Sequence, residues 1–223
     1  MARRTNTRER LLATAAELFW RQGYAQTGVN EIMQQAKTTS GSFYHFFPTK
    51  EDLVLAVVDH IGESLDTEVF ATDSGSTKDP LDRVFAVLES YRRHLVENDF
   101  ALGSPLGTLA GELSESHPQV RARLAALCAG WNRRMQELLE SAGDRLPADL
   151  DHSALAEFIL STVEGAVLQS RVRRSPAPLD SAVSALRRHF AMLGASGRPA
   201  PQRAPQPQPT PPSRTNAVDW RAW

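Results

Sequence analysis

Residues 43–47, FYHFF, are five consecutive ring-bearing side chains directly before Pro48. A helix brings only every third or fourth residue to one face, so it cannot bury such a run against a single neighbour. At roughly 100° per residue, Phe43 and Phe47 share one face and His45 lies opposite them. We therefore expect Phe43 and Phe47 to be core anchors. The residues presented outward are then Gly41, Ser42, Tyr44 and His45.

This helix is expected to be short, because Pro48 disfavours helical geometry in the residue before it. A helix of about two turns is not stable alone and must pack against a neighbour. The neighbour is predicted by an i, i+3, i+4, i+7 stripe of apolar residues, namely Val29, Ile32, Met33 and Ala36. Two short helices joined by a tight turn, the second beginning with small polar residues, predict a helix-turn-helix whose second helix enters the major groove of DNA.

Capping signals predict the ends of the N-terminal helices. Asn6 or Thr7 is expected to begin the first helix, and Gly23 to end it. Thr27 is expected to cap the second helix. Thr49, followed by Asp52 three residues later, is typical of a capping box at the start of a fourth helix.

The charge distribution agrees with a nucleic-acid partner for the N-terminal region only. Residues 1–50 hold seven Lys or Arg and three Glu, a formal net charge of +4. The whole chain has a net charge of −1, so the remainder carries −5. A basic end on an otherwise acidic protein is the pattern expected for phosphate binding.

Helical periodicity continues to about residue 193. Apolar stripes predict helices near 49–61, 81–95, 106–113, 120–138, 155–172 and 179–193. No stretch shows strand-like alternation, so we predict an all-α fold. Residues 195–223 differ, since seven of the 14 prolines lie between residues 199 and 212, and this composition predicts a disordered or polyproline-like tail.

Several other classes of protein are disfavoured. The single cysteine, Cys128, rules out an internal disulfide and fits a reducing compartment. The six histidines are scattered and none has metal-ligand spacing, so we expect no metal, no cofactor and no catalysis. No apolar run approaches the roughly 18 residues of a membrane span. We therefore expect a cytoplasmic protein without a membrane partner.

Residues 7–53, TRERLLATAAELFWRQGYAQTGVNEIMQQAKTTSGSFYHFFPTKEDL, closely resemble the DNA-binding domain of the TetR family of bacterial one-component repressors. The resemblance includes ELF and GY at the first helix, and the start of the second helix at Thr27. It continues through the pattern G-[ST]-[FL]-Y at residues 41–44 and P-[ST]-K-E-[DE]-L at residues 48–53. It implies a three-helix DNA-binding domain over residues 1–53 and a ligand-binding and dimerisation domain over residues 54–194.

The resemblance also implies roles for individual residues. The positions that face the operator are Thr39, Ser40, Gly41, Ser42, Tyr44 and His45. Thr27 and Lys50 match positions at helix N-termini that hold backbone phosphates. Arg3 and Arg4 are either a short basic arm that reaches an adjacent groove or a frayed terminus, and both interpretations stay open.

Three positions depart from the usual family pattern. His45 is shifted by one place relative to the usual histidine, so its phosphate contact does not carry over. Ser40 stands where many members have lysine. Lys37 stands where many members have glycine, which costs about 1 kcal/mol if the turn needs positive φ. Two explanations stay open: Lys37 is retained for an added phosphate contact, or the turn differs slightly from the usual turn of the family.

The resemblance is less specific in the second half. Residues 103–107, GSPLG, resemble a branch whose segment often reads glycine, cysteine, proline, a hydrophobic residue and glycine, with Ser104 in place of the cysteine. The candidate pocket residues are bulky apolar side chains with a few polar groups: Tyr91, His94, Leu95, Phe100, Leu109, Trp131, Asn132, Met135, Phe158, Val163 and Gln169.

The function expected from the resemblance is that of a repressor that binds a palindromic operator as a homodimer and is released by a small, largely apolar effector. The two C-terminal helices are the expected dimer interface, where residues 164–166 include small side chains. The alternative is a helical adaptor that binds only protein through its Pro-rich tail.

Overall fold

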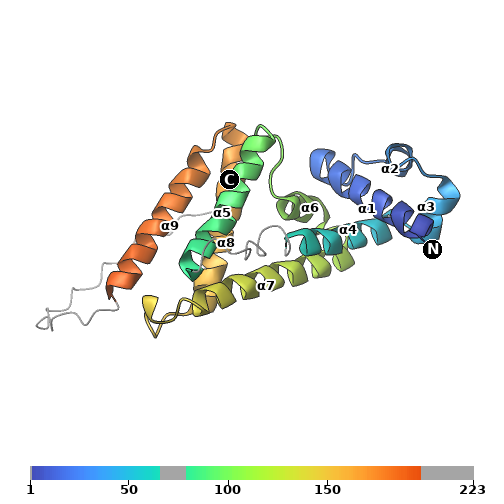
Figure 1. Cartoon of the computed structure of the whole chain (residues 1–223). Helices are drawn as coiled ribbons and strands as arrows, with labels where there is room; N and C mark the ends of the chain where they lie inside the picture. The colour runs from blue at the N-terminus through green and yellow to red at the C-terminus, as the bar shows by residue number, and fades with distance from the viewer. Residues whose placement is uncertain (1, 66–78, 197–223) are drawn as a thin grey trace, which may run out of the picture.

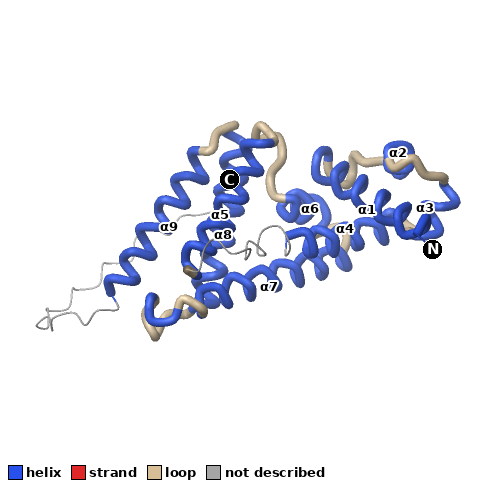
Figure 2. Tube along the Cα trace, viewed as in Figure 1, coloured by secondary structure: helices blue, strands red, loops and turns tan. Residues whose placement is uncertain are grey.

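The computed structural model describes residues 2–65 and 79–196. Every regular element in these two ranges is a helix, which confirms the predicted all-α class (Figure 2). From residue 197 onward, the predicted tail lies outside the described residues. The elements are α1 (Ala2–Gln22), α2 (Val29–Gln35), α3 (Ser40–Phe46), α4 (Lys50–Leu65), α5 (Pro80–Glu97), α6 (Pro105–Leu113), α7 (Pro118–Glu140), the 3-10 turn η2 (Gly143–Arg145), α8 (His152–Arg173) and α9 (Ala177–Ser196).

Helices α1, α2 and α3 form a three-helix unit at one end of the molecule (Figure 1). Helix α1 contacts both α2 and α3. Phe19, Ile32 and Phe43 are fully buried between them. The rings of Phe43 and Phe47 lie 6.2 Å apart, and Phe47 is only 3% exposed. The prediction that these two phenylalanines are core anchors is confirmed.

Local capping explains where these helices begin and end. The Oγ1 of Thr39 accepts a hydrogen bond from the backbone N–H of Ser42, which caps α3. At α4, the backbone N–H of Asp52 donates to Thr49 Oγ1 at 3.0 Å, and that of Thr49 donates to Asp52 Oδ2 at 3.0 Å. The capping box predicted at Thr49 is therefore confirmed. Gly23 follows α1 with φ of +87°, a left-handed conformation that favours glycine.

Two capping predictions were wrong. Helix α1 begins at Ala2, ahead of Asn6 and Thr7. The N-cap of α2 is Gly28, not Thr27. Thr27 is instead buried, and its hydroxyl donates to the carbonyl oxygen of Gly23 at 2.7 Å, inside the turn after α1.

Helix α4 joins the two ends of the molecule, because it packs against both α1 and α7. The domain boundary expected between residues 53 and 54 falls inside this helix. At the other end, α5, α8 and α9 pack together, with α5 and α8 also on α7 (Figure 1). Leu88, Met135 and Ile159 are among the fully buried residues there. A tilt of α4 relative to this bundle would move the three-helix unit as well.

Candidate DNA-binding surface and effector cleft

The outer face of α3 is exposed, as its sequence predicted. Thr39, Ser40, Gly41, Tyr44 and His45 are all exposed, and Ser42 is half-buried. The Tyr44 ring is 51% exposed and meets the buried ring of Phe43 edge-on at 5.1 Å. Tyr44 thus packs against a core ring and still keeps about half of its side chain exposed. The helix offers hydroxyl, phenol and imidazole groups, which are suited to contacts with base edges and phosphates.

Lys37 lies in the turn between α2 and α3. Its φ is +50°, so the positive φ considered from the sequence is present. Its backbone N–H donates to the carbonyl oxygen of Gln34 at 3.2 Å, and the next N–H, of Thr38, donates to Met33 at 3.0 Å. These bonds close the end of α2 and hold the lysine in a conformation that costs an L-residue about 1–2 kcal/mol. Its side chain is exposed beside α3.

The side chain of Lys50 points into the protein. Its Nζ donates a 2.6 Å hydrogen bond to the carbonyl oxygen of Tyr24 and lies 4.0 Å from the centre of the Tyr24 ring. Burial lowers the pKa of Lys50, while the Glu112 carboxylate acts in the opposite direction. The expected phosphate contact of Lys50 would therefore require this ammonium to leave its bond with Tyr24.

The remaining predicted phosphate contacts have different surroundings. Thr27 is 1% exposed and its hydroxyl is already bonded to Gly23. Its side chain is therefore not on the surface that α3 presents. Arg3 and Arg4 belong to the first turn of α1, so this part of the chain is helical rather than an extended arm.

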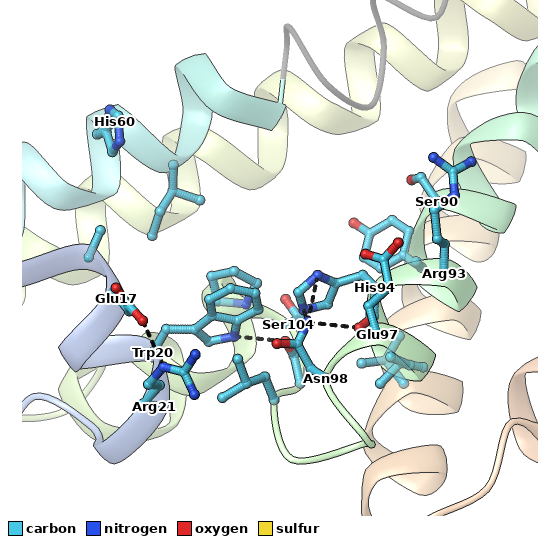
Figure 3. A pocket seen from close by; sticks show the side chains of 18 residues that line it. Glu17, Trp20, Arg21, His60, Ser90, Arg93, His94, Glu97, Asn98 and Ser104 are labelled. Atoms are coloured by element: carbon cyan, nitrogen blue, oxygen red, sulfur yellow. Dashed lines mark hydrogen bonds and ion pairs between the residues drawn. The ribbon is translucent and has the colours of Figure 1, made fainter. Parts of the chain in front are cut away.

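The three-helix unit is joined to the second domain by polar and ring contacts. The indole Nε1 of Trp20 donates a 2.8 Å hydrogen bond to the carbonyl oxygen of Gly103, and the Trp20 ring stacks on His94 at 4.5 Å. Figure 3 shows both rings side by side at the centre of the site. A second connection is made by α6, where Glu112 Oε2 accepts from the backbone N–H of Ala25 at 2.9 Å.

A cleft of about 520 Å³ lies at this junction. Five parts of the chain line it: the end of α1, the C-terminal half of α4, the C-terminal half of α5, residues 102–105 at the start of α6, and Val167 of α8. Trp20, Tyr91 and His94 provide its aromatic surface, and Ser90, Asn98 and Ser104 its uncharged polar groups (Figure 3). The cleft therefore touches both the DNA-binding unit and the helical domain.

The structure brings only some of the predicted pocket residues to this cleft. Tyr91, His94 and Leu95 line it. Leu109, Met135 and Val163 are buried core residues. Phe100 is half-buried in the turn after α5, and Asn132 is half-buried on α7. Trp131 borders a separate depression with Gly62 and Gly130, whereas Phe158 and Gln169 are exposed on α8.

Sequence reasoning missed the contribution of α1. Trp20 was overlooked because the whole first helix was assigned to DNA binding. A signal was present, since a large ring directly beside the buried Phe19 lies at the edge of the core face and must be covered by something else. Ser104 was noted only as a departure from a motif, yet it lines the cleft and its Oγ accepts from the backbone N–H of Gly107 at 3.2 Å, at the start of α6.

Two ionisable groups beside the cleft have displaced pKa values. Burial raises the pKa of Tyr91, and the nearby Glu164 carboxylate raises it further. Burial also raises the pKa of Glu164, while a hydrogen bond from the Ser104 side chain acts in the opposite direction. Oε1 of Glu164 is buried and has no hydrogen-bond partner. Displaced pKa values of this kind mark candidate functional groups.

Within residues 2–65 and 79–196, none of the helices is both long enough and apolar enough to span a bilayer. The same ranges contain no group of three or more His, Cys, Asp or Glu side chains arranged to hold a metal ion.

A short helix anchored by buried rings, exposed on its outer face and joined to a helical domain with a cleft, defines a helix-turn-helix DNA-binding protein. Two family models match the chain: "Bacterial regulatory proteins, tetR family" over residues 11–57, and "Tetracyclin repressor-like, C-terminal domain" over residues 80–186.

Individual proteins agree with these models. The transcriptional regulator AcuR of Cereibacter sphaeroides is 31% identical over 186 residues, covering 81% of this chain and 83% of AcuR. The transcriptional repressor DhaR of a Mycobacterium species is 26% identical over 179 residues, covering 79% of this chain and 88% of DhaR. A crystal structure of a TetR regulatory protein from Rhodobacter sphaeroides matches with a TM-score of 0.72 and 30% identity, covering 81% of this chain and 97% of that one.

The chain belongs to the TetR family of bacterial transcriptional regulators. It is therefore a DNA-binding regulator, and family membership confirms the expectation that it is not an enzyme.

Proposed function

We propose that this protein is a repressor that binds a palindromic operator as a homodimer and releases it when a small effector binds. The observation that carries this proposal is the exposed outer face of α3, fixed from behind by Phe43 and Phe47. A rigid helix with outward polar groups fits base recognition in the major groove. The groups proposed to face bases are the side chains of Thr39, Ser40, Ser42, Tyr44 and His45, with the backbone of Gly41 close to the DNA.

Phosphate contacts are proposed at the edges of this surface. Lys37 is exposed next to α3, and its charge is available for a backbone phosphate. Arg3 and Arg4 belong to the same basic N-terminal region and add to its attraction for DNA. For Lys50 we propose a phosphate contact only after its ammonium turns away from Tyr24.

The dimer is proposed to form through α8 and α9. Phe158, Leu168 and Val172 are 53%, 60% and 75% exposed on α8, and Met192 is 60% exposed on α9. The Phe158 ring lies 6.3 Å from that of His189, so the exposed faces of the two helices adjoin. Exposed apolar side chains gathered on one face are typical of a protein–protein interface. A symmetric dimer then requires an operator with two-fold symmetry.

The effector is proposed to bind in the cleft between α1 and α5. A ligand there would contact Trp20 of the DNA-binding unit and Tyr91 of the helical domain together. Release requires that the effector bind more tightly to a conformation that no longer fits both half-sites. We also propose that the chain belongs to the family branch with the Gly-Cys-Pro-like segment, because residues 103–107 read GSPLG, with Ser104 in place of the cysteine. Action on chromosomal DNA would place the protein in the cytoplasm.

The experiment that tests this function is a nuclease footprint on the intergenic DNA upstream of the protein's own gene. We expect two protected segments related by two-fold symmetry, separated by about one helical turn or a multiple of it. Leu168→Glu, which places a charge on the proposed dimer face, is expected to give a monomer in sedimentation velocity and to remove the footprint. Symmetric protection by a monomeric wild-type protein would contradict the dimer.

A further inference from the structure

Glu164 is a half-buried acidic residue for which the described part of the chain supplies no counter-charge. It lies in the middle of α8, and its Oε1 is buried without a hydrogen-bond partner. The Ser104 side chain acts on the carboxyl group by lowering its pKa, against the effect of burial. A Cβ placed on Gly107 would lie 3.4 Å from Glu164 Oε2 and 3.9 Å from Ser104 Oγ. The start of α6 therefore covers one side of the carboxyl group and leaves the Oε1 side without a donor.

The Glu164 charge also acts on Tyr91 from α5 and on the exposed Cys128 from α7, since the pKa of each is raised by desolvation and then by this carboxylate. None of these groups is a cation, and among the described residues Glu164 forms no ion pair. A buried carboxylate without a counter-ion is costly and favours its neutral form. A ligand that brings both a positive charge and an N–H donor would remove both deficits.

Glu164 does not itself line the cleft, but two residues that interact with it do. These two residues are Ser104 and Tyr91. A ligand that fills this part of the cleft would therefore be separated from the Glu164 carboxyl group by the Ser104 and Tyr91 side chains, and Ser104 would have to move for the two to meet. The apolar body of a ligand could rest on Trp20 and Tyr91, whose ring faces also attract cations.

The Lys, Arg, Asp and Glu side chains that line the cleft do not oppose a cation. The lining includes Glu17 and Glu97 as well as Arg21 and Arg93, so these four side chains are formally balanced. Arg21 is paired with Glu17 at 2.9 Å. Since these four formal charges cancel, they give the cleft no preference of their own for one ligand charge.

We infer that the effector is an organic cation with an N–H donor, a protonated amine on an apolar body, and that its ammonium group binds Oε1 of Glu164. This inference rests on the proposed function, in which the cleft holds the effector. Binding at Glu164 would displace the segment around Ser104. This segment includes Gly103, whose carbonyl oxygen accepts the hydrogen bond from Trp20. The same event would thus act on the junction with the DNA-binding unit.

The test compares three probes with one skeleton: phenethylamine, phenethyl alcohol and phenylacetate. Their affinities are measured by calorimetry for the wild type, Glu164→Gln and Glu157→Gln. Glu157 is an exposed glutamate on the same helix and serves as the matched control. Glutamine keeps the size of the side chain and removes the charge, and thermal unfolding checks that each variant is folded.

We expect the wild type and Glu157→Gln to bind the amine at least about tenfold more tightly than the alcohol, with the acid weakest. Glu164→Gln should lose this preference for the amine. An amine that binds no better than the alcohol to the wild type, or equally well to Glu164→Gln, would overturn the inference. A footprint measured in parallel separates the two proposals, because its absence would reject operator binding whatever the probes show. A footprint with no amine preference would reject only the cation.

Discussion

Trp20 and Gly103 are joined by a 2.8 Å hydrogen bond from the indole Nε1 to the backbone carbonyl, although 83 positions separate them in the chain. The bond links the helix that supports α2 and α3 to the segment that begins α6. The stack of Trp20 on His94 adds a contact with α5 at the same point. The junction between the two domains is therefore specific, and a ligand in the adjoining cleft could alter it.

Replacing Trp20 with phenylalanine removes the donor and keeps an aromatic ring against His94. We expect the free energy of unfolding to fall by about 1 kcal/mol, as for a typical hydrogen bond. Amide hydrogen exchange in the first turns of α6 should become faster, because the Gly103 carbonyl loses its partner. Unchanged exchange in α6 together with unchanged stability would show that this bond does not hold the domains together.

Phe43 and His45 are two residues apart and should respond oppositely to alanine. Phe43→Ala removes a fully buried ring, so we expect the free energy of unfolding, measured in urea, to fall by about 3–5 kcal/mol. His45→Ala changes an exposed residue, and unfolding should shift by less than about 0.5 kcal/mol while operator affinity falls. A stable Phe43→Ala protein that fails to bind DNA would mean that the faces of α3 are reversed.

Lys37→Gly tests the strained turn and its charge in one variant. Relief of the φ of +50° should raise the free energy of unfolding by about 1 kcal/mol, partly offset by the greater freedom of glycine in the unfolded chain. Loss of one phosphate contact should reduce the slope of log affinity against log salt by about 1. Lys37→Asn, which tolerates positive φ without the charge, is the control. An unchanged salt slope in both variants would remove Lys37 from the DNA interface.

Glu164→Gln should alter how stability depends on pH. Burial raises the pKa of Glu164 in the folded protein, so the folded state keeps its proton to higher pH than the unfolded state. The contribution of protonated Glu164 to the free energy of unfolding is fully present below the ordinary glutamate pKa. It is lost as the pH rises through the raised pKa that Glu164 has in the folded protein. Glutamine does not titrate, so the variant does not lose stability in this way. Between the ordinary glutamate pKa and the raised pKa of Glu164, the free energy of unfolding of the variant should therefore rise relative to that of the wild type. Urea unfolding at a series of pH values measures it, and parallel curves would contradict the burial of this charge.

The sequence predicted the DNA-binding unit well because its signals are local. The aromatic run, the apolar stripe before it and the Thr49–Asp52 capping pair each depend on residues a few positions apart. Thr27 was misjudged because a threonine before a helix normally caps it, whereas here its hydroxyl closes the preceding turn at Gly23. The inward contact of Lys50 was not predicted, because it requires Tyr24 to be brought close by folding.

The cleft was harder to predict because it is assembled from α1, α4, α5 and the start of α6. Helical periodicity identifies which face of each helix is apolar, but not which faces meet around a cavity. Tyr91 and His94 were found as bulky or polar residues of α5, whereas Phe158 has the same character and lies exposed on α8. The lack of a hydrogen-bond partner for Oε1 of Glu164 results from how the helices pack, so the sequence pattern does not predict it.

The most direct test of operator recognition by α3 is a mobility-shift titration on the upstream intergenic DNA across a salt series, with the wild type and Tyr44→Ala/His45→Ala. We predict a wild-type complex whose affinity falls steeply with salt and exceeds that for unrelated DNA. The double variant should remain folded, lose most of this preference, and keep a similar salt slope, because phosphate contacts remain. A double variant that still distinguishes the operator as well as the wild type would contradict the account.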